Sequence, residues 1–109
     1  MPDVFLSYSH TDQDAARRVA ERLAAAGWTT WWDQTLVPGE TWAEVTRAEL
    51  RAAHVVVALW SEASWPSRWV QAEAYAGYER RRLVCARLDN VVIEPPFNIL
   101  QTADLRAPD

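Results

Sequence analysis

The sequence contains no lysine, since all 11 of its basic residues are arginine. Schiff-base and catalytic-lysine chemistry are therefore excluded. Glycine is also scarce, with only Gly27, Gly39 and Gly77. These positions are too far apart to form a P-loop or a G-x-G-x-x-G turn, in which the backbone closely approaches phosphates. A dehydrogenase or an NTPase is thereby excluded as well.

The chain is equally poor in residues for metal or redox chemistry. Cys85 is the only cysteine and cannot form an internal disulfide, and its apolar neighbours predict a buried, unreactive side chain. His10 and His54 lie far apart with no cysteine near either of them, so the spacing of a metal site is missing. We expect neither a metal nor a resident cofactor.

Long apolar runs and an excess of basic residues are missing too. No stretch approaches the roughly 18 apolar residues that a membrane helix needs. The first residues carry no secretory signal. The net charge of −4 lacks the basic excess of nucleic-acid binders. We expect a cytoplasmic protein that binds neither nucleic acid nor membrane, and the arginine- and alanine-rich composition without lysine suggests a bacterial origin.

Apolar runs and amphipathic segments alternate along the 109 residues. This alternation predicts an α/β fold: one domain with a mainly parallel, open five-stranded sheet, right-handed crossovers and helices on both faces. Strands are expected at about 3–8, 28–32, 54–60, 83–88 and 99–105, and helices at about 11–27, 41–50 and 66–80.

Ligands of such sheets bind beyond the carboxyl ends of the strands. The candidate residues are therefore those that follow the strands, at 7–10, 32–40, 61–67 and 89–90. A response-regulator receiver has the same strand order but needs acidic residues after its first and third strands and a lysine after its fifth. Neither Ser7 nor Ser61 supplies an acid, so that class is excluded.

Trp69 and Glu73 stand out in the third expected helix. They are four residues apart and so lie on one face of a helix that begins at the ligand-binding edge. In isolation, such a pair is typical of a core tryptophan beside a solvated glutamate.

Three separated motifs resemble those of TIR (Toll/interleukin receptor) domains, in the same order and over nearly the whole chain. Residues 3–12 (DVFLSYSHTD) resemble the opening strand and loop of the family, and residues 32–39 (WDQTLVPG) resemble its BB loop. Residues 64–73 (SWPSRWVQAE) resemble the motif that carries the catalytic glutamate. The resemblance implies a flavodoxin-like TIR fold.

TIR domains comprise NAD-consuming enzymes and non-enzymatic signalling adaptors, and the glutamate best separates the two. The resemblance therefore implies that Glu73 is catalytic and that NAD+ is a substrate. Ser64 and Ser67 have an alternative role as caps of the third helix. Pro38 and Gly39 would form a BB-loop interaction surface. Substrate contacts are expected from Trp69, Ser9, His10, Trp32, Asp33 and Ser64.

One carboxylate suffices for this chemistry. The nicotinamide of NAD+ is already a cationic leaving group, so its departure needs no general acid, unlike the hydrolysis of ordinary glycosides. Glu73 can bind the ribose hydroxyls and stabilise an oxocarbenium-like transition state.

We expect a bacterial NAD+ hydrolase or cyclase in immune signalling that acts when TIR domains self-associate. The alternative is a non-enzymatic adaptor. Residues 1–109 are expected to be the N-terminal part of a longer protein with a sensor or oligomerising domain. Two departures from the family pattern predict a compact C-terminal half: the interval after the fourth strand is too short for a fourth helix, and only Phe97 matches the late Phe-Trp motif.

Overall fold

The computed structural model describes residues 3–32 and 42–106 of the chain. Strands and helices alternate in these ranges as expected, with bounds that differ by a few residues. The strands are β1 (Val4–Ser7), β2 (Thr30–Trp31), β3 (Val55–Trp60), β4 (Leu83–Arg87) and β5 (Thr102–Asp104); the helices are α1 (Gln13–Ala25), α2 (Trp42–Ala52) and α3 (Arg68–Glu79); and two 3-10 turns are η1 (His10–Asp12) and η2 (Phe97–Ile99).

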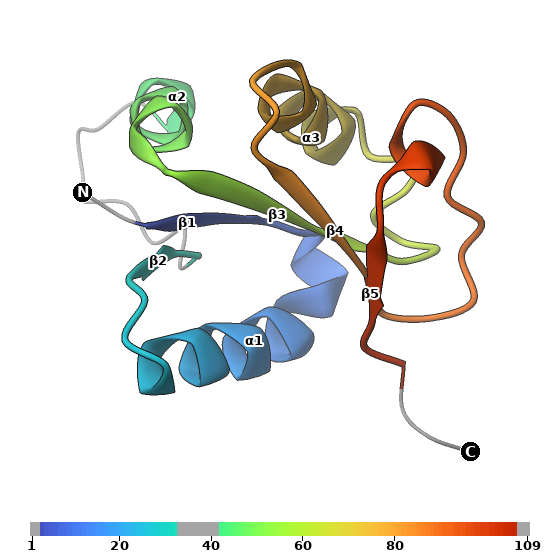
Figure 1. Ribbon diagram of the computed structural model, residues 1–109, viewed down its shortest axis with the longest axis horizontal. Coiled ribbons are helices and arrows are strands. Elements are labelled where there is room, and N and C mark those ends of the chain that lie inside the picture. The colour runs from blue at the N-terminus through green and yellow to red at the C-terminus, as the bar shows by residue number, and fades with distance from the viewer. Residues whose placement is uncertain (1–2, 33–41, 107–109) are drawn as a thin grey trace.

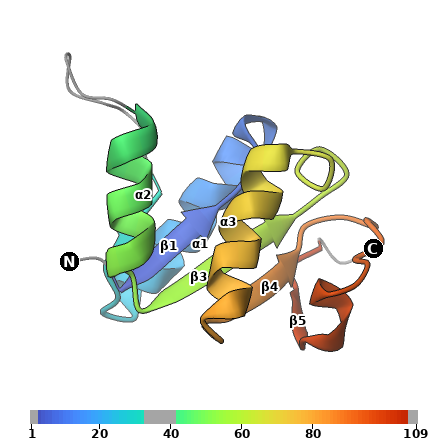
Figure 2. The same cartoon turned by 90° about the horizontal axis from the view of Figure 1, so that it is seen from above.

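The five strands form one sheet in the order β2-β1-β3-β4-β5, and every pairing is parallel. Helix α1 covers one face, whereas α2 and α3 cover the other (Figure 1). Seen from above, α2 and α3 lie side by side over the sheet (Figure 2). The predicted flavodoxin-like α/β fold is therefore confirmed. None of the helices in the described ranges combines the length and apolar character needed to cross a bilayer.

The strand order reverses between β1 and β3. From β1 the chain crosses to β2 on one side and then returns to place β3 on the other side. All four residues of β1 are buried, as expected for a strand that is covered on both faces. In open parallel sheets this switch point, at the carboxyl ends of the strands, is where ligands bind.

The C-terminal half is compact and has no α-helix between β4 and β5, as the sequence predicted. Between β4 and β5 the chain forms only the short turn η2. Its Phe97 is buried, and the ring centroid lies 5.3 Å from that of Trp60 and 5.9 Å from that of Tyr78. Trp60 in turn donates from Nε1 to Sγ of Cys85 at 3.3 Å. Cys85 is fully buried, as predicted, and this burial raises the pKa of its thiol.

Helix α3 packs closely on β3 at Gly77. A Cβ atom at this position would lie only 2.8 Å from Cβ of Val56, which is well inside van der Waals contact. Glycine at this position therefore determines how near α3 lies to the sheet.

We expect Gly77→Ala to lower the free energy of unfolding by about 1–3 kcal/mol, as overpacking of a close core contact does. Helix propensity alone predicts the opposite, because alanine is favoured over glycine by about 1 kcal/mol inside a helix. Urea unfolding measures the difference. The control Ala48→Gly, at an exposed position of α2, should cost about 1 kcal/mol by propensity. A more stable Gly77→Ala protein would contradict the close packing.

Candidate functional site

Glu73 lies on the sheet-facing side of α3. The helix buries Val70, Glu73, Ala74 and Gly77, which is the i, i+3, i+4, i+7 pattern of a helix face that packs against a core. Glu73 is only 3% exposed. A position that this pattern normally gives to an apolar residue is therefore occupied by an acid.

One carboxylate oxygen of Glu73 is held by β1. The hydroxyl of Ser7 donates to Oε1 at 2.6 Å. Ser7 is the last residue of β1, so this bond lies at the switch point of the sheet. The other oxygen, Oε2, is buried and has no hydrogen-bond partner among the described residues. A buried carboxylate oxygen without a partner raises the free energy of the folded state, and a hydrogen-bond donor on a ligand would lower it.

Burial controls the ionisation of Glu73. Removal from water raises the pKa of this carboxyl from 4.5 to about 7, while hydrogen bonding by the side chains of Ser7 and Trp69 lowers it to a smaller extent. Desolvation disfavours the charged form, and donors favour it. A carboxyl with a pKa near neutrality, in a cleft, is typical of a functional acid or anion.

A cleft of about 350 Å³ opens between α2 and α3 beside Glu73. Thr46, which is 1% exposed, has no hydrogen-bond partner for its Oγ1 within residues 3–32 and 42–106. Two residues that carry buried polar atoms without partners therefore line one cleft with apolar walls, a combination typical of small-molecule sites. The described lining residues are Thr46, Arg47 and Leu50 from α2 and Trp69, Ala72 and Glu73 from α3.

Arg80 ties the C-terminal ends of the two helices together. Its guanidinium donates to the backbone carbonyls of Leu50 at 3.4 Å and Arg51 at 3.0 Å. A cation also suits the negative end of the α2 dipole. One member of the exposed arginine run at 80–82 thus connects the two walls of the cleft.

The structure brings Trp69 and Glu73 together in this cleft but places Ser9 and His10 elsewhere. Ser9 caps the turn η1, where its Oγ accepts from the backbone N–H of Thr11 at 3.4 Å. His10 is exposed at the first position of that turn. Neither residue is among the described lining residues of the cleft.

Ser64 and Trp32 also lie outside the described lining. The hydroxyl of Ser64 is fully buried in the turn after β3 and donates to the carbonyl of Leu59 at 2.9 Å. The cap of α3 is instead Ser67, which accepts from the backbone N–H of Val70 at 3.3 Å. The predicted helix-capping role for Ser64 or Ser67 is therefore confirmed for Ser67, whereas the Ser64 hydroxyl is bonded within the turn after β3.

Trp32 accepts a hydrogen bond from the Tyr8 hydroxyl at its backbone carbonyl, at 2.6 Å. Asp33, Pro38 and Gly39 lie outside the described residues, so their roles stay predictions.

Sequence reasoning did not assign three residues that the structure places at the site: Ser7, Thr46 and Arg47. Ser7 belongs to the candidate range after the first strand, but nothing local identifies its partner. Thr46 had a usable signal, since it is a hydroxyl residue one helical turn before Leu50 on the buried side of α2. Arg47 had none, because an exposed arginine on a helix is ordinary.

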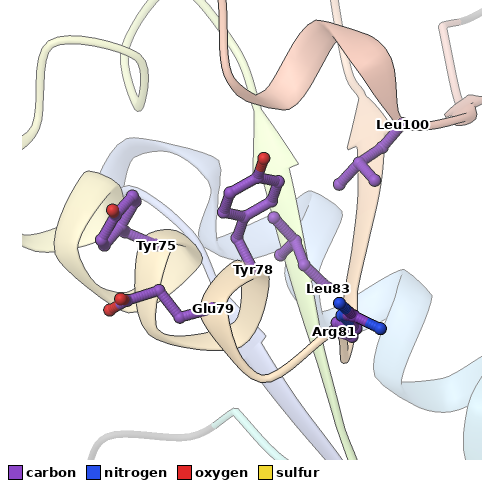
Figure 3. A pocket seen from close by; sticks show the side chains of 6 residues that line it. All are labelled: Tyr75, Tyr78, Glu79, Arg81, Leu83 and Leu100. Carbon is purple, nitrogen blue, oxygen red and sulfur yellow. The ribbon is translucent and has the colours of Figure 1, made fainter.

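A larger hollow of about 560 Å³ lies near the C-terminal end of α3 (Figure 3). It lies at the amino end of β4, where Leu83 begins the strand, and its charged members Glu79 and Arg81 are exposed. The carboxyl edge is the ligand-binding edge of such sheets, which favours the cleft at Glu73. No group of three or more His, Cys, Asp or Glu side chains in the described part of the chain is arranged to hold a metal ion.

Comparison with known families shows that the TIR domain family model matches residues 4–109. Among curated proteins, none matches the sequence.

Solved structures share the fold at low sequence identity. The TIR domain of the Toll-related receptor TRR-2 from Hydra magnipapillata has a TM-score of 0.85 at 15% identity, over 95% of this chain and 84% of that one. A TIR-STING receptor from C. gigas in complex with 2′,3′-cGAMP has a TM-score of 0.81 at 24% identity, over 97% of this chain and 35% of the receptor. A second structure of a C. gigas TIR-STING receptor has a TM-score of 0.79 at 24% identity, over 94% of this chain and 37% of the receptor.

The raised pKa of Glu73 predicts a specific pH dependence of stability. The ordinary pKa is 4.5 and the folded pKa is about 7, so between these values the folded state holds a proton that the unfolded chain has lost. The free energy of unfolding therefore falls as pH rises through this window. We expect the ionisation of Glu73 to lower the free energy of unfolding by on the order of 3 kcal/mol across this pH window.

Urea unfolding of the wild type and Glu73→Gln, at a pH below 4.5 and at one above 7, measures this contribution. The glutamine cannot ionise, so the difference in stability between the two proteins should change across the window. Glu79→Gln, at an exposed position of the same helix, should follow the wild type. A parallel pH dependence for Glu73→Gln and wild type would show that Glu73 is not desolvated.

Proposed function

The chain belongs to the TIR domain family, and from this premise we propose that it cleaves the bond between nicotinamide and ribose in NAD+, with Glu73 as the catalytic residue. The observation that carries the proposal is the arrangement of the Glu73 carboxyl. Its Oε1 is held by Ser7, its buried Oε2 has no partner among the described residues, and Glu73 lines a cleft.

The reaction requires an anion close to the ribose. As the C1–nitrogen bond breaks, its electron pair leaves with nicotinamide, which becomes neutral, and positive charge develops on the sugar. A fixed carboxylate in a dry site stabilises this charge strongly, because the interaction is not screened by water. Water then adds to C1 and releases a proton, which gives ADP-ribose; attack by a group of the ligand itself would give a cyclised product.

The surroundings of Glu73 support this role. The bond from Ser7 fixes the orientation of the carboxyl before substrate binds, which reduces the reorganisation needed during the reaction. Trp69 lines the same cleft and is 38% exposed, so its ring can stack on the nicotinamide.

Assembly with other copies is part of the proposal. Trp69 and Arg47 are exposed at the cleft, so the described residues of one copy leave this side of the cleft accessible. A neighbouring TIR domain can supply the missing wall, and the resemblance to NAD-consuming members of the family implies such assembly. We propose a role in immune signalling, with NAD+ cleavage switched on by clustering.

We expect the protein, fused to an oligomerising scaffold, to release nicotinamide from NAD+. Glu73→Gln should reduce the rate by at least about 100-fold, the usual loss when one electrostatic stabiliser of a transition state is removed. Glu79→Gln is the matched control and should keep the wild-type rate. The rate for each protein is measured by chromatography of the released nicotinamide and of the ribosyl product. Equal rates for Glu73→Gln and wild type would exclude the assigned role.

The pH profile gives a second test. Only the ionised carboxylate stabilises the cationic sugar, so kcat/KM should rise with pH with an apparent pKa of about 7, the pKa of Glu73. Removal of the Ser7 donor in Ser7→Ala should move this apparent pKa upward, because the hydrogen bond favours the charged form. An unchanged profile in Ser7→Ala would argue against the Ser7–Glu73 bond in the active protein.

Intact NAD+ at every protein concentration, with scaffold-imposed clustering, would overturn the enzymatic proposal. A loss of self-association in a Pro38 variant, together with intact NAD+, would identify the chain as a non-enzymatic adaptor instead.

A further inference from the structure

We propose that α2 supplies the phosphate-binding end of the site: Arg47 binds a phosphate of the ligand and Thr46 hydrogen-bonds its ribose. The chain would then prefer a ribosyl nicotinamide that carries a 5′-phosphate over the unphosphorylated nucleoside. This inference rests on the proposed function, since it names the part of the substrate that α2 recognises.

Thr46 provides the first observation. It is 1% exposed, lines the cleft and has no hydrogen-bond partner for its Oγ1 among the described residues. A valine has nearly the same shape and would avoid the cost of burying an unsatisfied hydroxyl. Glu73, whose Oε2 is also buried without a partner among the described residues, lines the same cleft. A polyhydroxylated ligand such as ribose can satisfy both groups.

Arg47 provides the second observation. It follows Thr46 directly on α2 and is the only basic residue in the described lining of the cleft. Thr46 is buried and Arg47 is exposed, so the arginine is the more accessible of these two lining residues. A guanidinium has five donors in a planar fork that matches the oxygens of a phosphate, and it can hold a second partner while doing so.

The two charged residues of the described lining come from different helices. Arg47 belongs to α2 and Glu73 to α3, so the cation and the acid are carried by the two walls of the cleft. Leu50 and Ala72 contribute apolar wall to the same cleft. A ligand with a cationic ring at one end and a phosphate at the other is complementary to this arrangement.

Three substrates test the inference: NAD+, nicotinamide mononucleotide and nicotinamide riboside, which has no phosphate. In Arg47→Gln we expect the KM for the two phosphorylated substrates to rise about 10- to 100-fold, as for the loss of a charged hydrogen bond. The kcat values and the KM for the riboside should stay unchanged. Arg51→Gln, one turn further along α2 and outside the described lining, should leave all three substrates unaffected. An unchanged KM for NAD+ in Arg47→Gln would overturn the role of Arg47.

Thr46→Val and Thr46→Ser separate ligand binding from folding. Valine replaces the hydroxyl with a methyl group of similar size, so it should raise the midpoint of thermal unfolding while it raises the KM for all three substrates. Serine keeps the hydroxyl and should retain the wild-type KM. A wild-type KM for Thr46→Val would overturn the role of Thr46.

Calorimetry separates this inference from the proposed reaction. Ribose 5-phosphate and ADP-ribose are titrated into wild type, Arg47→Gln and Arg51→Gln in the clustered form. Binding that Arg47→Gln weakens and Arg51→Gln does not would support the inference even if no NAD+ is cleaved. Turnover of NAD+ without weakened binding in Arg47→Gln would support the reaction and refute the inference.

Discussion

The hydrogen bond from Ser7 to Glu73 joins the end of β1 to the middle of α3, and the candidate site depends on it. It spans 66 positions in the sequence at a length of 2.6 Å. Its donor lies at the switch point of the sheet, where parallel strands present their carboxyl ends. Because one oxygen of the carboxyl is held there, the side chain of Glu73 has a defined orientation beside the cleft between α2 and α3.

The closeness of α3 to the sheet is the second constraint. Gly77 lets the helix approach Val56 so nearly that no Cβ fits between them, and this approach buries Glu73 one turn earlier. Burial in turn raises the pKa of the carboxyl. An acid at a core position lowers stability at neutral pH, and such a cost is typical of residues retained for function.

The two halves of the molecule differ in how they are covered. Beside β1 and β3 the sheet is covered by complete helices, and the candidate site lies there. Beside β4 and β5 a short turn with the buried Phe97 takes the place of a helix, and its ring packs in a cluster with Trp60, Trp65 and Tyr78. Aromatic side chains bury enough apolar area for one turn to close this side of the core.

The sequence by itself determined the α/β class, the five strands and the three helices, because alternating apolar periodicity is a local property of the chain. It also determined that Trp69 and Glu73 share a helix face, and three motifs identified the family. Only the tertiary structure decided that Glu73 is buried, that Ser7 is its partner and that Thr46 and Arg47 line the same cleft. These outcomes depend on the distance between packed helices and on contacts between residues far apart in the chain, which local periodicity does not specify.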